Sequence, residues 1–216
     1  MTKAKAAPVV TTDESVGQAD KRQKILDAAT RVFLARGYGE TSMDRVAQES
    51  GAARRTLYNQ FKSKEALFEA MVARIWSGFP VIDITRDEAS LTDPRHGLIR
   101  LGQAVADFWV PPESVAFLRM VIAEGPRFPA LTKTFLDKGK VPAMTAVADY
   151  LAALSKRKLV AIKDPKIAAR QFLGLIDEPL LWVRVVGLDE DYTPKQRRLI
   201  VESAVDMFLG FYTRKG

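Results

Sequence analysis

The sequence predicts an all-α protein of about nine to ten helices, and three observations lead to that prediction. Apolar residues recur three and four positions apart through most of the chain, which is the period of an amphipathic helix. The alternation of apolar and polar residues that a half-buried strand requires persists nowhere. The chain has 216 residues, of which 47% are apolar, so a sizeable core can be buried.

The first 20 residues are predicted to be a disordered tail, because they show no helical period and no apolar stretch long enough for a signal peptide. The first helix is expected to begin near Lys21 and to end at Gly37. Its buried stripe should consist of Ile25, Ala29, Val32 and Phe33.

Residues 41–61 predict a helix-turn-helix. A first amphipathic helix ends at Gly51, where a glycine can adopt a left-handed conformation without strain. A second helix over about 53–61 places Leu57 and Phe61 on one face, where both side chains can pack inward. Two helices joined by a short turn that contains glycine are typical of this motif.

The outward side of the second helix carries residue types suited to DNA. Arginine can bind a guanine edge through two hydrogen bonds, asparagine an adenine edge, and hydroxyl groups suit phosphate oxygens. A short basic helix can also be a merely solvated surface, but Thr41 and Ser42 can cap the first helix and offer hydroxyls to a phosphate. The charge of Lys64, just after a cap at Ser63, would be balanced by a phosphate. The residues predicted to contact DNA are Thr41, Ser42, Arg54, Arg55, Thr56, Tyr58, Asn59 and Lys64.

Proline and glycine divide the rest of the chain into helices. A proline preceded by an aspartate or threonine marks several helix starts, and one of them, at Thr193, is completed by a capping box with Gln196. Pro179 lies inside an apolar helix and predicts a kink just after Glu178. Further helices are expected at 64–76, 97–109, 114–124, 127–138, 141–156, 166–187 and 195–214, with a loop over 77–93.

Composition excludes several classes of function. The chain has no cysteine, and His96 is its only histidine, so disulfides, thiolate metal sites and multi-histidine metal sites are all excluded. Asp177 and Glu178 are adjacent, so on a helix they point about 100° apart and cannot easily share a substrate. No glycine-rich phosphate loop is present. We therefore expect no enzyme, no metal and no cofactor.

Charge and hydropathy indicate the kind of partner. The net charge is +7, and residues 1–64 hold 12 Lys and Arg against 7 Asp and Glu, so most of the positive excess lies with the helix-turn-helix. A phosphate-binding surface requires such an excess. No apolar run approaches the roughly 18 to 20 residues of a membrane span, so we expect a cytoplasmic protein with no membrane partner.

Between residues 24 and 71 the chain has the following ordered set of residues: Ala29, Phe33, Gly37, Tyr38, Thr41, Ser42, Val46, Ala47, Gly51, Ala52, Thr56, Leu57, Tyr58, Phe61, Ser63, Lys64, Glu65 and Leu67. Through these residues the segment resembles the DNA-binding domain of TetR/AcrR-type transcriptional regulators. Two positions depart from the pattern of that family: Ala53 replaces a capping serine, and Arg55 stands where glycine is frequent. The first departure should weaken the start of the recognition helix by roughly 1 kcal/mol.

The resemblance implies a three-helix head followed by a helical body that binds a ligand and dimerises. The expected domains are a DNA-binding domain at 21–64 and an effector-binding and dimerisation domain at 65–216. Residues 117–124, 128–129 and 168–172 are also similar to the C-terminal domain of the AefR-like branch. In the family the last two helices form a four-helix dimer interface. The residues expected there are Leu180, Leu181, Trp182, Val185, Leu199, Val205, Phe208, Leu209 and Tyr212.

The effector pocket is expected among the middle helices, where aromatic and sulfur-containing side chains suit an apolar ligand. Charged residues amid apolar helices need partners, and a ligand is one possibility. The residues assigned to this pocket are Trp76, Phe79, Phe108, Trp109, Arg119, Met120, Glu124, Phe128, Met144, Phe172 and Asp177.

The predicted function is a sequence-specific transcriptional regulator, a repressor that binds double-stranded operator DNA as a homodimer and releases it when a small, hydrophobic or aromatic effector binds. Two alternatives are an architectural DNA-binding protein and a small-molecule carrier, neither of which has ligand-controlled operator release. The sequence leaves open the effector, the operator, the regulated genes, repression versus activation, and whether one or two dimers bind.

Overall fold

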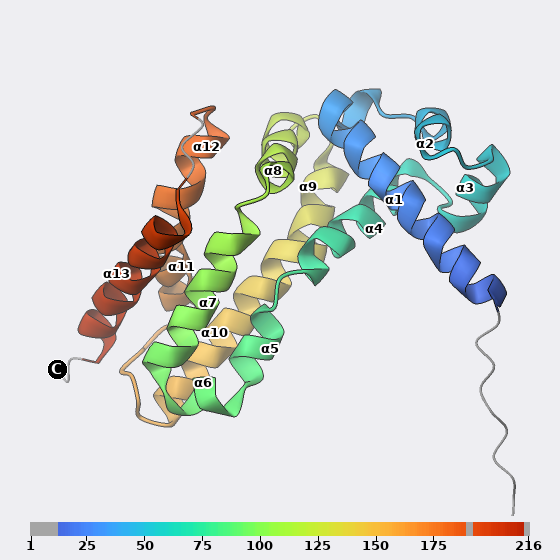
Figure 1. The fold of residues 1–216 in the computed structure, drawn as a ribbon. Helices are drawn as coiled ribbons and strands as arrows, with labels where there is room; N and C mark the ends of the chain where they lie inside the picture. The colour runs from blue at the N-terminus through green and yellow to red at the C-terminus, as the bar shows by residue number, and fades with distance from the viewer. Residues whose placement is uncertain (1–12, 189–191, 214–216) are drawn as a thin grey trace, which may run out of the picture. The chain divides into compact units, whose positions relative to one another are not determined.

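The computed structural model describes residues 13–188 and 192–213, and within these ranges every regular element is a helix (Figure 1). The chain divides into two compact units, Met1–Met71 and Val72–Gly216, which we call the head and the body. None of the described helices combines the length and the apolar character needed to cross a bilayer. The all-α prediction is therefore confirmed.

The head contains α1 (Asp13–Glu40), α2 (Met43–Ser50), α3 (Arg54–Gln60) and the first turns of α4 (Lys64–Ser77). The first helix begins at Asp13, so residues 13–20 are helical and were wrongly included in the predicted tail; residues 1–12 lie outside the described ranges. An ion pair of 2.8 Å between Asp20 and Lys24, one turn apart, supports this early start.

The core of the head has the predicted composition. Ile25, Ala29 and Phe33 are fully buried on α1, and Leu57 and Phe61 turn inward from the second half of the motif. The rings of Phe33, Tyr38 and Phe68 form a cluster with centroids 5.3–5.7 Å apart. This cluster joins α1 to α4, while α2 packs on both α1 and α3.

The body consists of helices packed around one continuous core. In it α10 packs on α5 and α11, and α13 packs on α7 and α11. Two segments have π-helical rather than α-helical hydrogen bonding. The elements are α5 (Val81–Arg86), α6 (Glu88–Thr92), α7 (Pro94–Phe108), α8 (Pro112–Glu124), α9 (Pro129–Phe135), η1 (Leu136–Lys140), α10 (Val141–Lys156), α11 (Pro165–Asp177), η2 (Glu178–Trp182), α12 (Val183–Val185) and α13 (Pro194–Tyr212).

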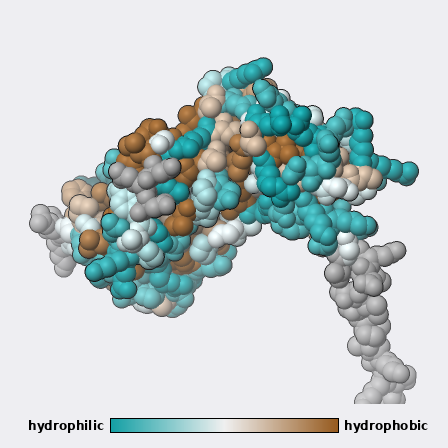
Figure 2. Space-filling model, turned by 45° about the horizontal axis from the view of Figure 1, so that its top comes forward, coloured by the Kyte–Doolittle hydropathy of each residue, from teal (hydrophilic) through white to brown (hydrophobic). Residues whose placement is uncertain are grey.

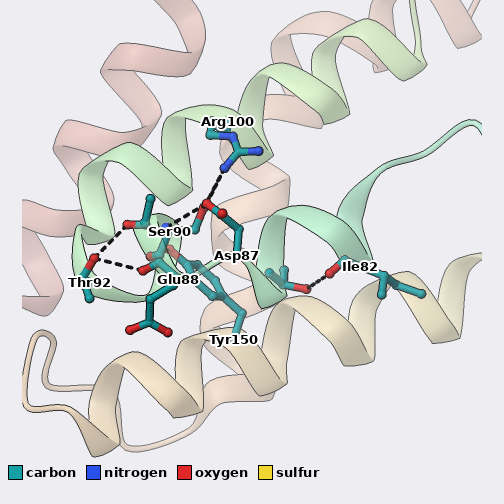
Figure 3. Close-up of polar contacts among 9 residues, drawn as sticks. Ile82, Asp87, Glu88, Ser90, Thr92, Arg100 and Tyr150 are labelled. Carbon is teal, nitrogen blue, oxygen red and sulfur yellow. Dashed lines mark hydrogen bonds and ion pairs between the residues drawn. The ribbon is translucent and has the colours of Figure 1, made fainter.

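The loop predicted over 77–93 was wrong, because it contains α5 and α6. Asp87 caps α6 by accepting a hydrogen bond from the Ser90 amide at 3.1 Å, and Arg100 on α7 lies 2.6 Å from the same carboxylate (Figure 3). The Tyr150 hydroxyl donates to the Ser90 carbonyl at 2.8 Å. These contacts hold two helices that are too short to persist alone.

The separate helices predicted at 127–138 and 141–156 are joined, because α9 continues through η1 into α10. The helix predicted over 166–187 changes from α to π at Glu178, next to Pro179, where the kink was expected. When α9, η1 and α10 are counted as one helix, and α11, η2 and α12 as another, the described residues form eleven helices, slightly more than the nine to ten predicted. The capping box of Thr193 and Gln196 begins α13 as expected.

Candidate DNA-binding surface and ligand cavity

The helix-turn-helix forms at the predicted residues. Ser42 caps α2 by accepting a hydrogen bond from the Arg45 amide at 3.3 Å. Gly51 ends α2 with a left-handed conformation, φ 67°, and its amide donates to the Gln48 carbonyl. A side chain at this φ would be strained, which explains why glycine occupies the turn. No side-chain cap precedes α3 at Ala53, as the sequence predicted.

The outward face of α3 carries most of the residues predicted to contact DNA. Arg54, Arg55, Tyr58 and Asn59 are exposed, and Thr56 is half-buried. The Nε atom of Arg54 lies 2.6 Å from an oxygen of Asp44 on α2, so the Asp44 carboxylate forms an ion pair with one edge of the Arg54 guanidinium. Ser42, the cap of α2, is also exposed.

Thr41 and Lys64 are placed differently from the others. Thr41 is only 3% exposed, and its hydroxyl donates to the Gly37 carbonyl at 2.7 Å. The Nζ of Lys64 donates to the Tyr38 carbonyl at 2.9 Å and lies 4.5 Å from the centre of the Tyr38 ring. Burial, with Glu65 beside it, raises the pKa of Tyr38 to about 12, so its hydroxyl stays protonated and donates to Glu65. Both predicted DNA contacts are thus engaged inside the head.

The body contains a large cavity of about 1010 Å³ that opens to the surface, and every residue that lines it belongs to this unit. Aromatic rings form much of its wall: Trp76 and Phe108 have centroids 4.9 Å apart, and Phe79 and Phe135 pack against them. Both π segments contribute to the lining. The predicted pocket residues that line it are Trp76, Phe79, Phe108, Trp109, Met144 and Asp177.

Five residues assigned to the pocket do not line this cavity. Phe172 is fully buried and packs on Phe208 at 5.2 Å, and Met120 is also in the core. Arg119 is exposed and binds backbone carbonyls of α12, with its Nε 3.0 Å from the Val185 oxygen. Glu124 is half-buried outside the lining, and the guanidinium of Arg127 covers the ring of Phe128.

Asp177 is the carboxylate best placed for recognition in the cavity. Its Oδ1 accepts a hydrogen bond from the Trp109 indole at 3.0 Å. Burial raises the pKa of Asp177 to about 6, although this hydrogen bond and the charge of Lys140 both favour the ionised form. The Nε1 of Trp76, which also belongs to the wall, is a buried donor without a hydrogen-bond partner in the described part of the chain.

Sequence reasoning missed most of the lining on α8 to α11, although a periodic signal was present. Lining residues occur at i, i+3, i+4 and i+7 in four separate segments, which is one face of a helix each time. These sets are Leu118, Val121, Ile122 and Gly125; Pro129, Thr132, Lys133 and Leu136; Lys140, Ala143, Met144 and Val147; and Arg170, Leu173, Gly174 and Asp177.

Apolar side chains are exposed on the last helices of the body. Figure 2 shows hydrophobic surface, in brown, gathered around α12. Leu199, Met207 and Phe211 are 66%, 55% and 71% exposed, at helical spacing along one side of α13. Trp182 and Val186, one turn apart, are 50% and 75% exposed.

The residues predicted for the dimer interface divide into two groups. Leu180, Leu181, Val205 and Phe208 fill the core of the body itself and present no surface to a second chain, because the opposite side of α13 packs on α7 and α11. Trp182 and Leu199 are exposed, and Val185, Leu209 and Tyr212 are half-buried. Val186, Met207 and Phe211 are also exposed but were not among the predicted residues, since helical spacing alone does not distinguish the two faces.

Two family models match the sequence. Residues 25–71 match the one described as bacterial regulatory proteins, tetR family. Residues 96–214, more than half of the chain, match the one described as AefR-like transcriptional repressor, C-terminal domain.

Similar proteins extend these matches to the whole fold. A TetR-family transcriptional regulator from Mesorhizobium loti MAFF303099 is 27% identical, with a TM-score of 0.75 over 90% of this chain and 98% of that chain. The flavonoid-responsive regulator FrrA is 28% identical, with a TM-score of 0.72 over 92% and 100%. The transcriptional activator FasR of Mycolicibacterium smegmatis is 33% identical over 89 residues, which are 41% of this chain and span only 40% of FasR.

Proposed function

This chain belongs to the TetR family of bacterial transcriptional regulators, and on that basis we propose that it represses transcription by binding a specific operator as a homodimer. A small hydrophobic or aromatic molecule in the body cavity releases the operator. The protein works in the cytoplasm, by binding alone and without a catalytic step or cofactor. Repression follows the description of the family model that matches the body.

The observation that carries this proposal is the outward face of α3. Arg54, Arg55, Tyr58 and Asn59 lie exposed on the second helix of a helix-turn-helix. The inward face of the same helix is fixed by Leu57, which is fully buried. A rigid helix that presents two guanidinium groups, a phenol and an amide has the donors and acceptors that major-groove recognition requires.

A homodimer supplies the geometry for operator recognition. The exposed apolar side chains of α13, together with Trp182 and Val186 on either side of α12, support an interface between two bodies, because burying each such side chain is worth about 1.5–3 kcal/mol. Two heads then reach successive major grooves on one side of the DNA, roughly 34 Å apart or a multiple of that distance. The operator should therefore be a partial palindrome.

Ligand release uses α4, the helix that contains the boundary between head and body. Trp76 lies near its end and lines the cavity. A ligand that favours one position of Trp76 favours one position of this helix, and it shifts the protein toward the state in which that position is preferred. The flavonoid-responsive neighbour FrrA supports an aromatic ligand.

The test is to select bound sequences from random duplex DNA with the purified protein and to measure the mass of the complex. A two-fold-related motif bound by one or two dimers is expected. Failure to enrich any motif at moderate salt, with and without candidate ligands, would reject the regulator proposal.

Two variants of the recognition face make that test specific. Arg55→Ala and Asn59→Ala should each weaken binding to the selected operator by roughly 1–3 kcal/mol and relax the preference at particular base pairs. Arg86→Ala changes an exposed arginine of the body and serves as the matched control. Equal losses for all three variants on every sequence would indicate nonspecific attraction to phosphate instead.

The cavity also favours a second candidate, a small-molecule carrier, because about 1010 Å³ is ample for binding without any DNA. The carrier would bind ligand normally in an Arg54→Ala, Asn59→Ala double variant and would show no operator in the selection. An architectural DNA-binding protein would instead bind duplex DNA with no sequence preference. Activation rather than repression, as in FasR, would appear as increased transcription from the selected operator.

A further inference from the structure

The cavity combines aromatic walls with one partly unsatisfied carboxylate, and this combination indicates the chemistry of its ligand. The rings of Trp76, Phe79 and Phe108 lie with centroids 4.9–5.9 Å apart along one wall. Offset and edge contacts at these distances suit a flat aromatic molecule, which can extend the same packing. The inference that follows rests on the proposed ligand-responsive function.

Asp177 provides the polar contact. One of its oxygens accepts the hydrogen bond from Trp109, and its other oxygen has no hydrogen-bond partner within residues 13–188 and 192–213. The residue lines the cavity from the last turn of α11. This oxygen is not among the fully buried polar atoms, so it can accept a hydrogen bond from a molecule that enters the cavity.

The other charged residues around the cavity leave Asp177 as the acceptor. Lys133 forms an ion pair with Asp137, so these two charges balance each other. Lys140 and Arg170 are exposed, and the charge of Lys140 acts on Asp177. These cations could attract a carboxylate ligand from solvent, but a carboxylate placed deeper in the cavity would be repelled by Asp177.

We propose that the cavity selects a neutral, flat aromatic molecule bearing a hydroxyl group, and that this hydroxyl donates a hydrogen bond to Asp177. The aromatic rings supply most of the affinity through apolar contact. Asp177 supplies the specificity, because it favours the hydroxylated molecule over the same ring system without the hydroxyl. Aliphatic acids are disfavoured by both features.

The proposal predicts a pH dependence. Asp177 is mainly neutral at pH 5 and mainly ionised at pH 7, because its pKa is about 6. The ionised carboxylate is the stronger acceptor, so affinity for the hydroxylated ligand should rise over this range. The charged residues of the lining are Lys133, Asp137, Lys140, Arg170 and Asp177, and the chain's only histidine, His96, is not part of it.

The test uses isothermal titration calorimetry of the full chain, without DNA, with monohydroxyflavones substituted on either ring, unsubstituted flavone and dodecanoate. At least one monohydroxyflavone should bind about ten-fold more tightly than flavone at pH 7, since a hydrogen bond to a charged group is worth that much. This advantage should shrink at pH 5. Dodecanoate should bind more weakly than the preferred monohydroxyflavone.

The variant Asp177→Asn keeps the size of the side chain and its acceptor for Trp109 but removes the charge. It should lose the hydroxyl advantage and the pH dependence while it keeps the affinity for flavone. Asp149→Asn makes the same chemical change at an exposed position outside the lining and should behave as the wild type. Retained affinity for flavone also shows that the variant is folded.

Each outcome decides the proposal. Equal affinity for flavone and all monohydroxyflavones, an unchanged advantage in Asp177→Asn, no binding of any flavone, or tighter binding of dodecanoate would each overturn it. Failure of the operator selection with intact, Asp177-dependent ligand binding would reject the regulator proposal and leave this inference standing. Selection of an operator by a protein that binds no flavone would reject this inference and leave the regulator proposal standing.

Discussion

Asp177 is half-buried in surroundings that disfavour its charged form, and the effect of this on the stability of the fold can be measured. Burial raises the pKa of Asp177 from its usual value near 3.8 to about 6, so the fold favours the neutral acid. The corresponding stability is present below about pH 3.8 and is lost as the pH rises through 6, where the carboxylate ionises in the folded protein.

Asp177→Asn should therefore be more stable than the wild type at pH 7.5, by about 1–3 kcal/mol, and equal to it near pH 4. The amide keeps an acceptor for the Trp109 indole and cannot ionise. Urea denaturation at both pH values measures the difference, with Asp149→Asn as the control. A difference that is the same at both pH values would show that packing, and not ionisation, accounts for it.

Lys64 was predicted to contact a phosphate, and its contacts within the head suggest a second, structural role. Its position after a helix cap suggested a phosphate contact, but its amine binds the Tyr38 carbonyl and covers the Tyr38 ring. Lys64→Ala should destabilise the head by about 1–2 kcal/mol through loss of these contacts. Lys62→Ala, which removes an exposed lysine two residues earlier, should have little effect in the same denaturation experiment.

Operator binding separates the two roles of Lys64. An unchanged stability of Lys64→Ala, together with a salt dependence lowered by about one unit, would restore the phosphate assignment. A lower stability of Lys64→Ala, together with an unchanged salt dependence of operator binding by the folded protein, supports the internal role.

At the scale of elements, Gly139 in η1 allows a close approach to Trp76, which lines the cavity. Its Cα lies against the indole of Trp76, and a methyl group at this position would overlap the ring. Gly139→Ala should therefore destabilise the body by about 1–3 kcal/mol and change the tryptophan fluorescence.

Gly174→Ala is the matched comparison, because it adds a methyl group to a helix in the same lining with nothing within 4 Å. It should be neutral or stabilising by about 0.5–1 kcal/mol, since alanine is the better helix former. Similar losses for both variants in thermal denaturation would mean that the contact between Gly139 and Trp76 contributes nothing specific.

The sequence predicted most helices, because caps and apolar periods are local signals. Ser42, Gly51 and the capping box of Thr193 act within one turn, so a reader of the sequence can locate them. The helices α5 and α6 depend on contacts such as that between Arg100 and Asp87, which join separate segments and leave no local pattern.

For the candidate sites, too, the features set by local sequence were predicted and those set by packing between helices were not. The exposed face of α3 follows from the helix-turn-helix pattern, and Arg54, Arg55, Tyr58 and Asn59 were all predicted. The cavity was predicted from residue type, which correctly selected aromatic rings but also selected core side chains such as Phe172. Which apolar face meets a cavity and which meets the core depends on packing between helices, and sequence period alone does not decide it.

At the scale of the whole molecule, the proposed dimer depends on one exposed apolar side of α13. The double variant Leu199→Glu, Phe211→Glu places charges at two of its most exposed positions and should give a folded monomer, because buried unpaired charges are costly. Light scattering after size-exclusion chromatography measures the mass. Ile82→Glu changes an exposed isoleucine of α5 and should leave the dimer intact.

The same variants test how far operator binding depends on pairing. The monomer should lose most of its affinity for a two-fold-related operator, since each head alone contacts one half-site. A double variant that remains dimeric would place the interface on another surface of the body.

The π segment η2 also fixes the rotational phase of the end of its helix. A π turn amounts to one residue more than an α-helix would hold, so everything after it is turned by about 100° relative to a continuous helix. Residues before η2 face the cavity through Asp177, while Val186 after it is exposed. Deleting a single residue from η2 would therefore turn the residues after it by about 100° relative to those before it. A one-residue deletion in η2 thus changes the orientation of the exposed apolar residues relative to the residues that line the cavity.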